Sequence, residues 1–410
     1  MWKSGAQLWL LTAILLTVAM LLGRTGPGTY SPAALALVGI SVLTSIAAVR
    51  APVSQSILPI AVAAKKRRIA LVFIFLTGIG LGIATLLWIA PERIDVYLFQ
   101  RDAAAALLRG SNPYSITHQN LYVKNPSFFY GPGVVTNGRI NFGFQYPPLS
   151  LLAILPAYLL GDLRYTYVAA VVLSAALLAR MRASRITLVA VILLLLSPVT
   201  FYVLSRAWTE PLVLFALCCT CAAAARRSRW LPVALGLFFA CKQYSVLALP
   251  LAGLLLPRFT WRAYLRLLAE AAGIALVVTT PLAVWNLHHF WRDVVVWQII
   301  QPFRPDALSF SVLAVRRGLP QIPQLLVIIA VFATTVWSLR ATRPRPAAFP
   351  GCLALVLLVF FCVNKQAFVN YYFLVIGAAL LAAVMADPPP ILIPAPNCSR
   401  AVSDLDVTVS

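Results

Sequence analysis

A carboxylate stands just beyond one of the long apolar runs of this sequence. The run LVFIFLTGIGLGIATLLWIAP ends at Pro91, and Asp95 follows it in the stretch ERIDVYLFQRDAAAALLRGSNPY. A carboxylate at the end of a membrane helix can act as a general base toward a hydroxyl group that approaches from water. It can also simply cap the helix at the membrane surface, so the other charged residues have to decide between the two roles.

Further charged residues fall on the same predicted side of the membrane, which is the extracytoplasmic side. The cations that stand next to apolar runs there are Arg206, Lys242, Arg304 and Lys365. The acids predicted there are Glu92, Asp95, Asp102, Asp162, Glu210, Asp293 and Asp306. Each cation alone could be a snorkelling anchor. Together, cations that stabilise a departing phosphate and a carboxylate that accepts a proton would suit group transfer from a lipid phosphate.

The elements that must position these residues are membrane helices. The chain has 410 residues, of which 61% are hydrophobic and only 11% are charged. A helix needs about 20 apolar residues to cross the ~30 Å core of a bilayer. Runs near this length recur from end to end, and they predict an all-α, multi-pass membrane protein with about 12 transmembrane helices. The predicted spans are roughly 7–23, 32–49, 69–90, 165–181, 187–204, 210–225, 231–241, 245–257, 264–284, 321–340, 349–363 and 371–386.

The net charge of +22 would suggest a nucleic-acid partner for a soluble protein. Here the cations gather in short loops, as the positive-inside rule requires of loops that face the cytoplasm. The predicted spans place five basic groups on that side: residues 50 and 65–68, 180–185, 226–229, 258–266 and 340–345. Both ends of the chain would then be cytoplasmic, and no nucleic-acid partner is expected. Attraction to anionic lipid or to a phosphate-bearing substrate is a second possible use of the charge.

This topology has two consequences. The segment 147–161 holds three prolines in 15 residues and is predicted to lie at the membrane surface or to re-enter the membrane. The run 231–257 must be a hairpin, because basic groups flank both of its ends. Its turn would lie at Lys242 and Gln243, which keeps the lysine away from the bilayer centre, where insertion costs roughly 2.5–3.5 kcal/mol.

Two long loops then fall on the extracytoplasmic side, at residues 91–164 and 285–318. Loops of this length are usually functional or disordered, and their many aromatic residues argue against disorder. We expect amphipathic, juxtamembrane helices within them, for example at 98–109 and 290–300. The remaining expectations concern domain boundaries: two additional N-terminal transmembrane helices in 1–68, the first retained although it resembles a signal sequence, a core at 69–386, and a disordered cytoplasmic tail at 387–410.

No cofactor site stands out in the sequence. It holds no GxxxxGK[ST] phosphate loop and no GxGxxG that opens a helix after a strand. His118, His288 and His289 are too scattered to predict a metal site, and the seven cysteines are expected to be small buried hydrophobic residues. We therefore expect neither a divalent metal nor another cofactor beyond a lipid-linked substrate.

The order of several short motifs resembles a known family. Residues 95–99 read DVYLF, 109–114 read RGSNPY and 145–149 read QYPPL. TEP at 209–211, CKQ at 241–243 and NKQAFVNYY at 364–372 follow. This pattern, spread from about residue 69 to 386, resembles the GT-C superfamily of membrane glycosyltransferases. Within it, the pattern is most similar to glycosyltransferase family 87, the polyprenyl-phosphate-mannose-dependent mannosyltransferases and their relatives.

The resemblance implies a GT-C fold with a catalytic aspartate in the first long extracytoplasmic loop, a role that falls to Asp95. It also implies that residues at later helix ends, here Lys242, Gln243, Lys365 and Gln366, contact the phosphate or the sugar of the donor. Some GT-C enzymes carry paired acids at the first site, whereas this chain has a single aspartate followed by Val96. That difference argues against a metal-dependent mechanism of the oligosaccharyltransferase kind.

These patterns together predict an inverting membrane glycosyltransferase. It would move one sugar, mannose or a related hexose or pentose, from polyprenyl phosphate to an extracytoplasmic glycan or glycolipid acceptor. Asp95 would be the general base, and Lys242, Lys365, Arg206 and Arg304 would neutralise the phosphate. The other residues predicted to contact substrate are Tyr97, Arg101, Tyr146, Glu210, Gln243, Gln366, Asn370, Tyr371, Tyr372 and His288. The tyrosines could instead form an interfacial aromatic belt, Glu210 could cap a helix, and His288 could be an ordinary loop residue.

A multi-pass transporter or a flippase of lipid-linked sugars is the alternative, because such proteins also carry ionisable groups among their membrane helices. Two features favour the transferase. The apolar runs show no evident inverted repeat, and the polar groups gather at one interface, whereas alternating access would favour the midplane. A catalytically silent scaffold for envelope assembly is also compatible with the sequence.

Overall fold

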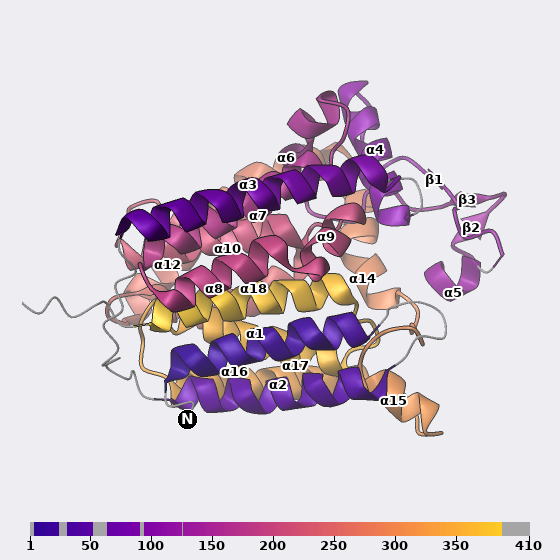
Figure 1. Ribbon diagram of the computed structural model, residues 1–410. Coiled ribbons are helices and arrows are strands. Elements are labelled where there is room, and N and C mark those ends of the chain that lie inside the picture. Colours follow the sequence, from indigo (N-terminus) through magenta and orange to yellow (C-terminus); the bar gives the residue numbers. More distant parts are fainter. Residues whose placement is uncertain (1–3, 24–30, 52–63, 91–93, 125, 388–410) are drawn as a thin grey trace, which may run out of the picture.

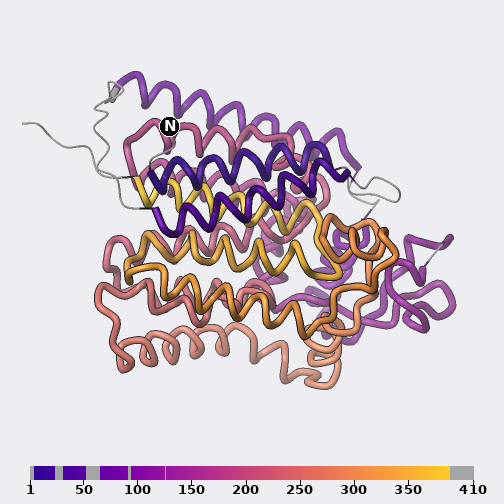
Figure 2. Tube along the Cα trace, turned by 90° about the horizontal axis from the view of Figure 1, so that it is seen from below, coloured from indigo at the N-terminus to yellow at the C-terminus, as the bar shows by residue number. Residues whose placement is uncertain are grey.

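The computed structural model describes residues 4–23, 31–51, 64–90, 94–124 and 126–387. Its long helices lie side by side in one bundle, and smaller elements gather at one end of it (Figures 1 and 2). The predicted tail after Asp387, and the predicted far-side acid Glu92, lie outside the described residues.

Seven helical segments in the described part of the chain are long and apolar enough to cross a membrane. Six are single helices: α1 (Gly5–Leu22), α2 (Pro32–Arg50), α3 (Ala64–Trp88), α12 (Trp261–Trp285), α16 (Gln324–Ala341) and α18 (Val369–Ala386). The seventh is made of α8 (Arg185–Leu196) and α9 (Pro198–Ser205), which meet at Ser197. The protein is thus a multi-pass, helical membrane protein, as predicted.

The other predicted spans are helical but shorter. They are α7 (Tyr165–Met181), α10 (Glu210–Ala225), α11 (Leu231–Cys241), the 3₁₀ helix η2 (Gln243–Leu255) and α17 (Phe349–Val363). The count of about 12 spans is therefore not confirmed, although each of the predicted segments is helical. Sequence runs report where the apolar residues are, whereas prolines and buried polar residues decide where each helix ends.

Local sequence explains several helix boundaries. The side-chain oxygens of Ser4, Ser31, Ser184 and Thr260 each accept the backbone N–H three residues later, which caps α1, α2, α8 and α12. Pro198 lacks the N–H that would continue α8, and its fixed φ suits the first turn of α9. The predicted span 187–204 is for this reason two helices.

Helix α18 forms the centre of the bundle, and nearly all of its side chains are buried. It packs against α1, α8, α10 and α17. A Cβ atom on Gly377 would come within 2.5 Å of Leu214 Cδ2 of α10, so the glycine permits this close contact. Helices α1 and α2 pack against each other and against α18 and α17, and the N-terminal pair is therefore part of the same bundle.

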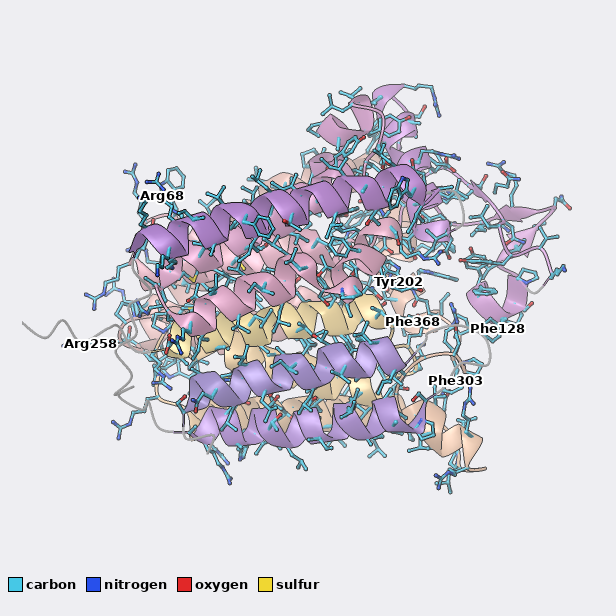
Figure 3. The ribbon with its side chains drawn as sticks, in the orientation of Figure 1. Arg68, Phe128, Tyr202, Arg258, Phe303 and Phe368 are labelled. Carbon is cyan, nitrogen blue, oxygen red and sulfur yellow. The ribbon has the colours of Figure 1, made fainter. Side chains whose placement is uncertain are left out.

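The two ends of the bundle differ in charge. Arg68 and Arg258 lie at one end, and Tyr202, Phe128 and Phe368 lie at the other (Figure 3). Two more arginines lie at the same end as Arg68 and Arg258, as their hydrogen bonds show. Arg67 Nη2 donates to Ala179 O at 2.6 Å, and Arg182 Nε donates to Asp387 O at 3.2 Å. We call these the basic end and the loop end.

The run 231–257 turns back at the loop end, as the hairpin prediction requires. Lys242 separates α11 from η2 with an extended backbone (φ −154°, ψ 147°). It shares a cavity with Tyr202 and Phe368, whereas Arg258 beyond η2 lies at the basic end (Figure 3). The lysine therefore lies at the loop end of the bundle and not halfway along a membrane helix.

The first long loop folds into helices and a small sheet. Its helices are α4 (Asp95–Leu108), α5 (Pro126–Tyr130) and α6 (Pro148–Leu159). Strands β1 (His118–Gln119), β2 (Val135–Thr136) and β3 (Arg139–Ile140) pair antiparallel in the order β1-β3-β2. Asn137 and Gly138 join β2 to β3 with φ of 50° and 74°, as a two-residue hairpin turn needs. Helices α4 and α6 were expected, whereas the strands were not.

The second long loop is also mostly helical. It contains α13 (Leu287–Phe290), the π-helical turn η3 (Trp291–Val296), α14 (Trp297–Ile300) and α15 (Phe310–Arg316). The run from α13 to α14 covers the helix expected at 290–300. Buried Asp293 ties this loop to the first one, because its Oδ2 accepts the N–H of Gly143 at 2.7 Å. Gly143 has no room for a side chain, since a Cβ atom would lie 2.5 Å from Tyr114 O.

The packing of α11 on α12 leads to a prediction about stability. A Cβ atom on Gly236 would lie 2.5 Å from Ala271 O and 2.7 Å from Ile274 Cβ. We expect Gly236→Ala to force the helices apart and to lower the free energy of unfolding by about 1–3 kcal/mol, the usual range for overpacking. Thermal unfolding of the detergent-purified protein measures this change. The matched control is Gly273→Ala on α12, where nothing lies within 4 Å. It should leave stability unchanged or raise it, and equal losses in both variants would contradict the packing.

Candidate functional site

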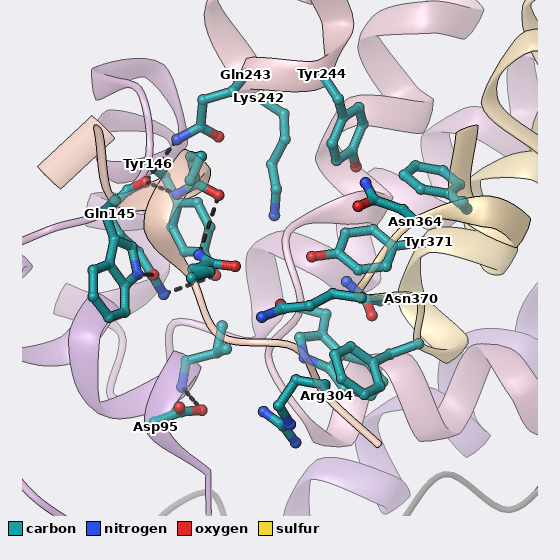
Figure 4. A pocket seen from close by; sticks show the side chains of 18 of the residues that line it. Asp95, Gln145, Tyr146, Lys242, Gln243, Tyr244, Arg304, Asn364, Asn370 and Tyr371 are labelled. Carbon is teal, nitrogen blue, oxygen red and sulfur yellow. Dashed lines mark hydrogen bonds between the residues drawn. The ribbon is translucent and has the colours of Figure 1, made fainter. Parts of the chain in front are cut away.

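A cavity of about 610 Å³ lies at the loop end (Figure 4). Its walls come from the start of α4, the segment 142–146, the end of α9, the start of η2, the residues from α14 to Asp306, and the junction of α17 and α18. Ten residues singled out from the sequence line it: Asp95, Tyr146, Arg206, Lys242, Gln243, Arg304, Lys365, Gln366, Asn370 and Tyr371. The fold thus brings the predicted acid and all four predicted phosphate-binding cations to one place.

Five of the predicted substrate contacts do not line this cavity: Glu210, which is described below, and Tyr97, Arg101, His288 and Tyr372. Tyr97 and Arg101 come two and six positions after Asp95, and the helical repeat of about 3.6 residues turns both away from the side that Asp95 faces. Tyr97 is buried, and Arg101 pairs with Asp102 at 3.1 Å. His288 is exposed on α13. Tyr372 is fully buried and donates to Leu308 O at 2.6 Å, so it holds the second long loop in place.

Asp95 is the first residue of α4 and lies in the cavity wall. Its Oδ1 accepts a hydrogen bond from the backbone N–H of Val96 at 2.8 Å, and its Oδ2 accepts one from the hydroxyl of Tyr130 at 3.1 Å. Burial raises the pKa of the Asp95 carboxyl, while the bonds from Tyr130 and Val96 and the charge of Arg304 oppose this rise. The phenol of Tyr122 also interacts with this carboxyl. A carboxylate with a raised pKa that is held by phenols is suited to accept a proton.

Lys242 points into the cavity from the turn between α11 and η2 (Figure 4). Its Nζ lies 3.1 Å from Glu210 Oε1, 2.6 Å from Thr209 Oγ1 and 4.1 Å from the centroid of the Tyr146 ring. Glu210 was predicted to contact substrate, but it is fully buried behind Lys242 and is absent from the cavity lining. Its chemical partner in this structure is the lysine.

The other three cations are held in different ways. Arg304 makes two hydrogen bonds of 2.8 Å to Asp306, and its guanidinium lies among the rings of Phe128, Phe129 and Phe368. Arg206 stacks over its helix neighbour, the Tyr202 ring, at 5.3 Å.

Among the described residues, the ammonium group of Lys365 binds backbone oxygens: its Nζ donates to Ile299 O at 2.7 Å and to Gln301 O at 2.5 Å. Burial lowers the pKa of this lysine.

Several neutral residues of the cavity were missed from the sequence. They include Tyr122, Tyr130, Gln145, Trp297, Gln298 and Asn364. Gln145 is the best connected of them: its Oε1 accepts Trp297 Nε1 at 3.1 Å, and its backbone oxygen accepts the amide of Gln243 at 2.7 Å. The sequence shows that these residues lie in or beside loops rich in aromatic residues. It does not show which residues of those loops face the cavity.

The structure offers no obvious metal site within its described residues. No group of three or more His, Cys, Asp or Glu side chains lies together there. The expectation of a metal-free mechanism stays a prediction. The six cysteines of the described residues are free thiols and five of them are buried, as expected, while Cys398 lies outside those residues.

Comparison with known proteins supports the fold. No protein-family model and no curated protein sequence matches this chain. Among solved structures, ArnT from Cupriavidus metallidurans bound to undecaprenyl phosphate has 19% sequence identity and a TM-score of 0.51. The similarity covers 77% of this chain but only 59% of ArnT.

The structure of ArnT in the apo state gives 18% identity, the same coverage and a TM-score of 0.48. This chain thus spans less than two thirds of the length of the solved protein that it resembles. At such low identity the likeness concerns the fold, and ArnT is a protein of the GT-C superfamily. The chain therefore has the GT-C fold that its motifs predicted.

Proposed function

We propose that this protein is a membrane glycosyltransferase that moves one sugar from a polyprenyl-phosphate donor to a hydroxyl group of a glycan or glycolipid. The observation that carries the proposal is the single cavity in which Asp95 faces the same space as Lys242, Lys365, Arg206 and Arg304. These residues come from five distant segments of the chain. The solved ArnT structure, which holds undecaprenyl phosphate in a protein of similar fold, supports this class of donor.

The lining of the cavity suits the parts of such a donor. The cations offer charge and N–H groups to a phosphate. Val246, Leu247 and Phe360 add an apolar stretch beside them, and Val246 of η2 is 52% exposed. A polyprenyl chain could therefore extend from the phosphate into the bilayer. Gln145, Gln298 and Trp297 present amides and a ring to a neutral sugar.

The transfer step follows from these positions. Asp95 accepts the proton of the acceptor hydroxyl as its oxygen bonds to the anomeric carbon. The bond from that carbon to the phosphate oxygen breaks, and its electron pair leaves on polyprenyl phosphate. The cations stabilise this negative charge as it develops. Attack from the face opposite the phosphate inverts the anomeric centre.

Three finer features belong to the same proposal. Mannose is the sugar that the motif resemblance favours, and family 87 is the subfamily. The active site would be extracytoplasmic, because the basic groups gather at the opposite end of the bundle and the positive-inside rule assigns that end to the cytoplasm.

Release of polyprenyl phosphate from labelled donors carrying different sugars would test sugar and donor together, and vesicle uptake of the same donors would reveal a transporter instead.

The first prediction from this proposal concerns Asp95 itself. Asp95→Asn keeps the shape of the side chain but removes the proton acceptor, so we expect transfer to fall by about 10²–10⁴-fold, the usual contribution of a general base. Donor binding should persist. The rate of polyprenyl phosphate release in membranes measures the effect. The matched control is Asp102→Asn on the same helix, since Asp102 pairs with Arg101 and His118 outside the cavity. Unimpaired turnover in Asp95→Asn would remove Asp95 from the mechanism.

The second prediction concerns pH. Asp95 must be ionised to accept a proton, so activity should fall as the pH drops through its pKa. Burial raises this pKa, and we therefore expect the midpoint of the acid limb above pH ~4, the ordinary value for aspartate. Tyr130→Phe removes a hydrogen bond that favours the ionised form, and this loss should move the midpoint to still higher pH.

The pH profile of the transfer rate checks this prediction in both proteins. Tyr158→Phe is the control, because Tyr158 lies on α6 outside the cavity and should leave the midpoint in place. A midpoint that stays the same or falls in Tyr130→Phe would contradict the proposed role of the phenol.

A further inference from the structure

We propose that Glu210 is a positioning residue for Lys242. It keeps the ammonium group charged and directed into the cavity, and it cancels that charge, so that Lys365 and Arg206 supply the net positive charge to an anionic ligand. The identity of the ligand rests on the proposed function, whereas the pairing of Glu210 with Lys242 does not.

The burial of both partners makes each dependent on the other. The side chains of Lys242 and Glu210 are 7% and 0% exposed, and their charged atoms lie 3.1 Å apart. A charge left unpaired in such a place is strongly unfavourable. The hydroxyl of Tyr244 also donates to Glu210 Oε1 at 3.1 Å, while Oε2 is buried without a hydrogen-bond partner in the described structure. Lys242 is therefore the source of positive charge that stabilises the Glu210 carboxylate.

The pairing changes the charge balance of the cavity. Arg304 is neutralised in the same way, because Asp306 binds it through both carboxylate oxygens. Lys365 and Arg206 have no carboxylate within salt-bridge distance in the described part of the chain. An ammonium group has three N–H donors, and Lys365 uses two on backbone oxygens, which leaves one for a ligand.

Lys242 then has a directional role. Thr209, Glu210 and the ring face of Tyr146 fix its Nζ at the cavity wall, so it can donate a hydrogen bond to the ligand from a set position. The pair remains neutral while it does so. The four cations that look alike in the sequence are thus divided into two that bring net charge and two that bring placed donors.

The other titratable groups near this pair are neutral around pH 7, since a thiol titrates near 8.5 and a phenol near 10 before any burial. These groups are Cys241 of α11, Tyr244 of η2, Tyr146 before α6, Tyr167 of α7 and Tyr371 of α18. Among the described residues, Glu210 is thus the group whose removal would change the charge of Lys242 between pH 6 and 9.

The experiment replaces Glu210 with its uncharged isostere. In Glu210→Gln the buried ammonium loses its counter-charge, so its pKa should fall. Binding of polyprenyl phosphate by the purified protein is measured from pH 6 to 9 and divided by wild-type binding at each pH, which cancels the ionisation of the ligand itself. We expect this ratio to decline as the pH rises, with the protonated fraction of Lys242 dropping about tenfold per pH unit above its new pKa.

Two variants separate this effect from structural damage. Asp306→Asn removes the acid of the other ion pair at the cavity, but arginine keeps its proton throughout this range, so no new pH dependence is expected. Glu210→Gln combined with Lys242→Arg should abolish the pH dependence for the same reason. A ratio that stays flat in Glu210→Gln alone would overturn the proposal.

A second measurement needs no ligand. The pH dependence of acetylation at Lys242, followed by mass spectrometry with Lys365 as internal reference, reports when the amine loses its proton. We expect the midpoint for Lys242 to lie at lower pH in Glu210→Gln than in the wild type. In Glu210→Asp the midpoint should move less, and this variant replaces the glutamine variant in the test if that one does not fold. Equal midpoints in all of these proteins would overturn the proposal. Failure of the wild type to bind polyprenyl phosphate would overturn the donor assignment alone.

Discussion

The need to pair a buried lysine governs the loop end of this protein. Lys242 interrupts an apolar run that would otherwise be long enough to cross the bilayer, and a charge inside the hydrocarbon core is costly. The chain therefore turns at Lys242, and two short helices replace one long one. The ammonium still has to leave water, and Glu210 at the start of α10 balances it. One ion pair thus joins the turn of the hairpin to the first turn of the neighbouring helix.

The same end of the molecule shows how long loops can hold a precise site. Gln243, next to Lys242, donates to the backbone oxygens of Gln145 and Val294, one from each long loop. Lys365 donates to backbone oxygens at the end of α14, and the backbone N–H of Leu308 donates to Ala367 O at 2.9 Å. Residues at helix ends therefore fasten both loops to the bundle. Gln243 and Lys365 both line the cavity, so these two side chains border the candidate site and fasten the loops at the same time.

The membrane bundle, its basic end and the charged residues that line the cavity could be predicted from the sequence, and the reason is physical. Charged residues are rare beside apolar runs, so Asp95, Lys242 and Lys365 are conspicuous without any structure. Helix phase is harder, because Tyr97 and Arg101 could be assigned to a face only once α4 was known to begin at Asp95. The tyrosines around Asp95 lie near a small sheet whose turn, Asn137-Gly138, was present in the sequence as a hairpin signal but was not used.

Arg164, which lies outside the cavity, holds the helix end that precedes the proposed base. This arginine is only 1% exposed, and it donates to Leu86 O and Ile89 O, both at 2.8 Å, as well as pairing with Asp162. Carbonyl groups in the last turn of a helix have no partner within the helix, and a buried guanidinium satisfies them. The end of α3 is thereby fixed against the start of α7. Asp95 begins the next helix six residues after Ile89, so Arg164 holds the chain close in sequence to the proposed base although it does not line the cavity.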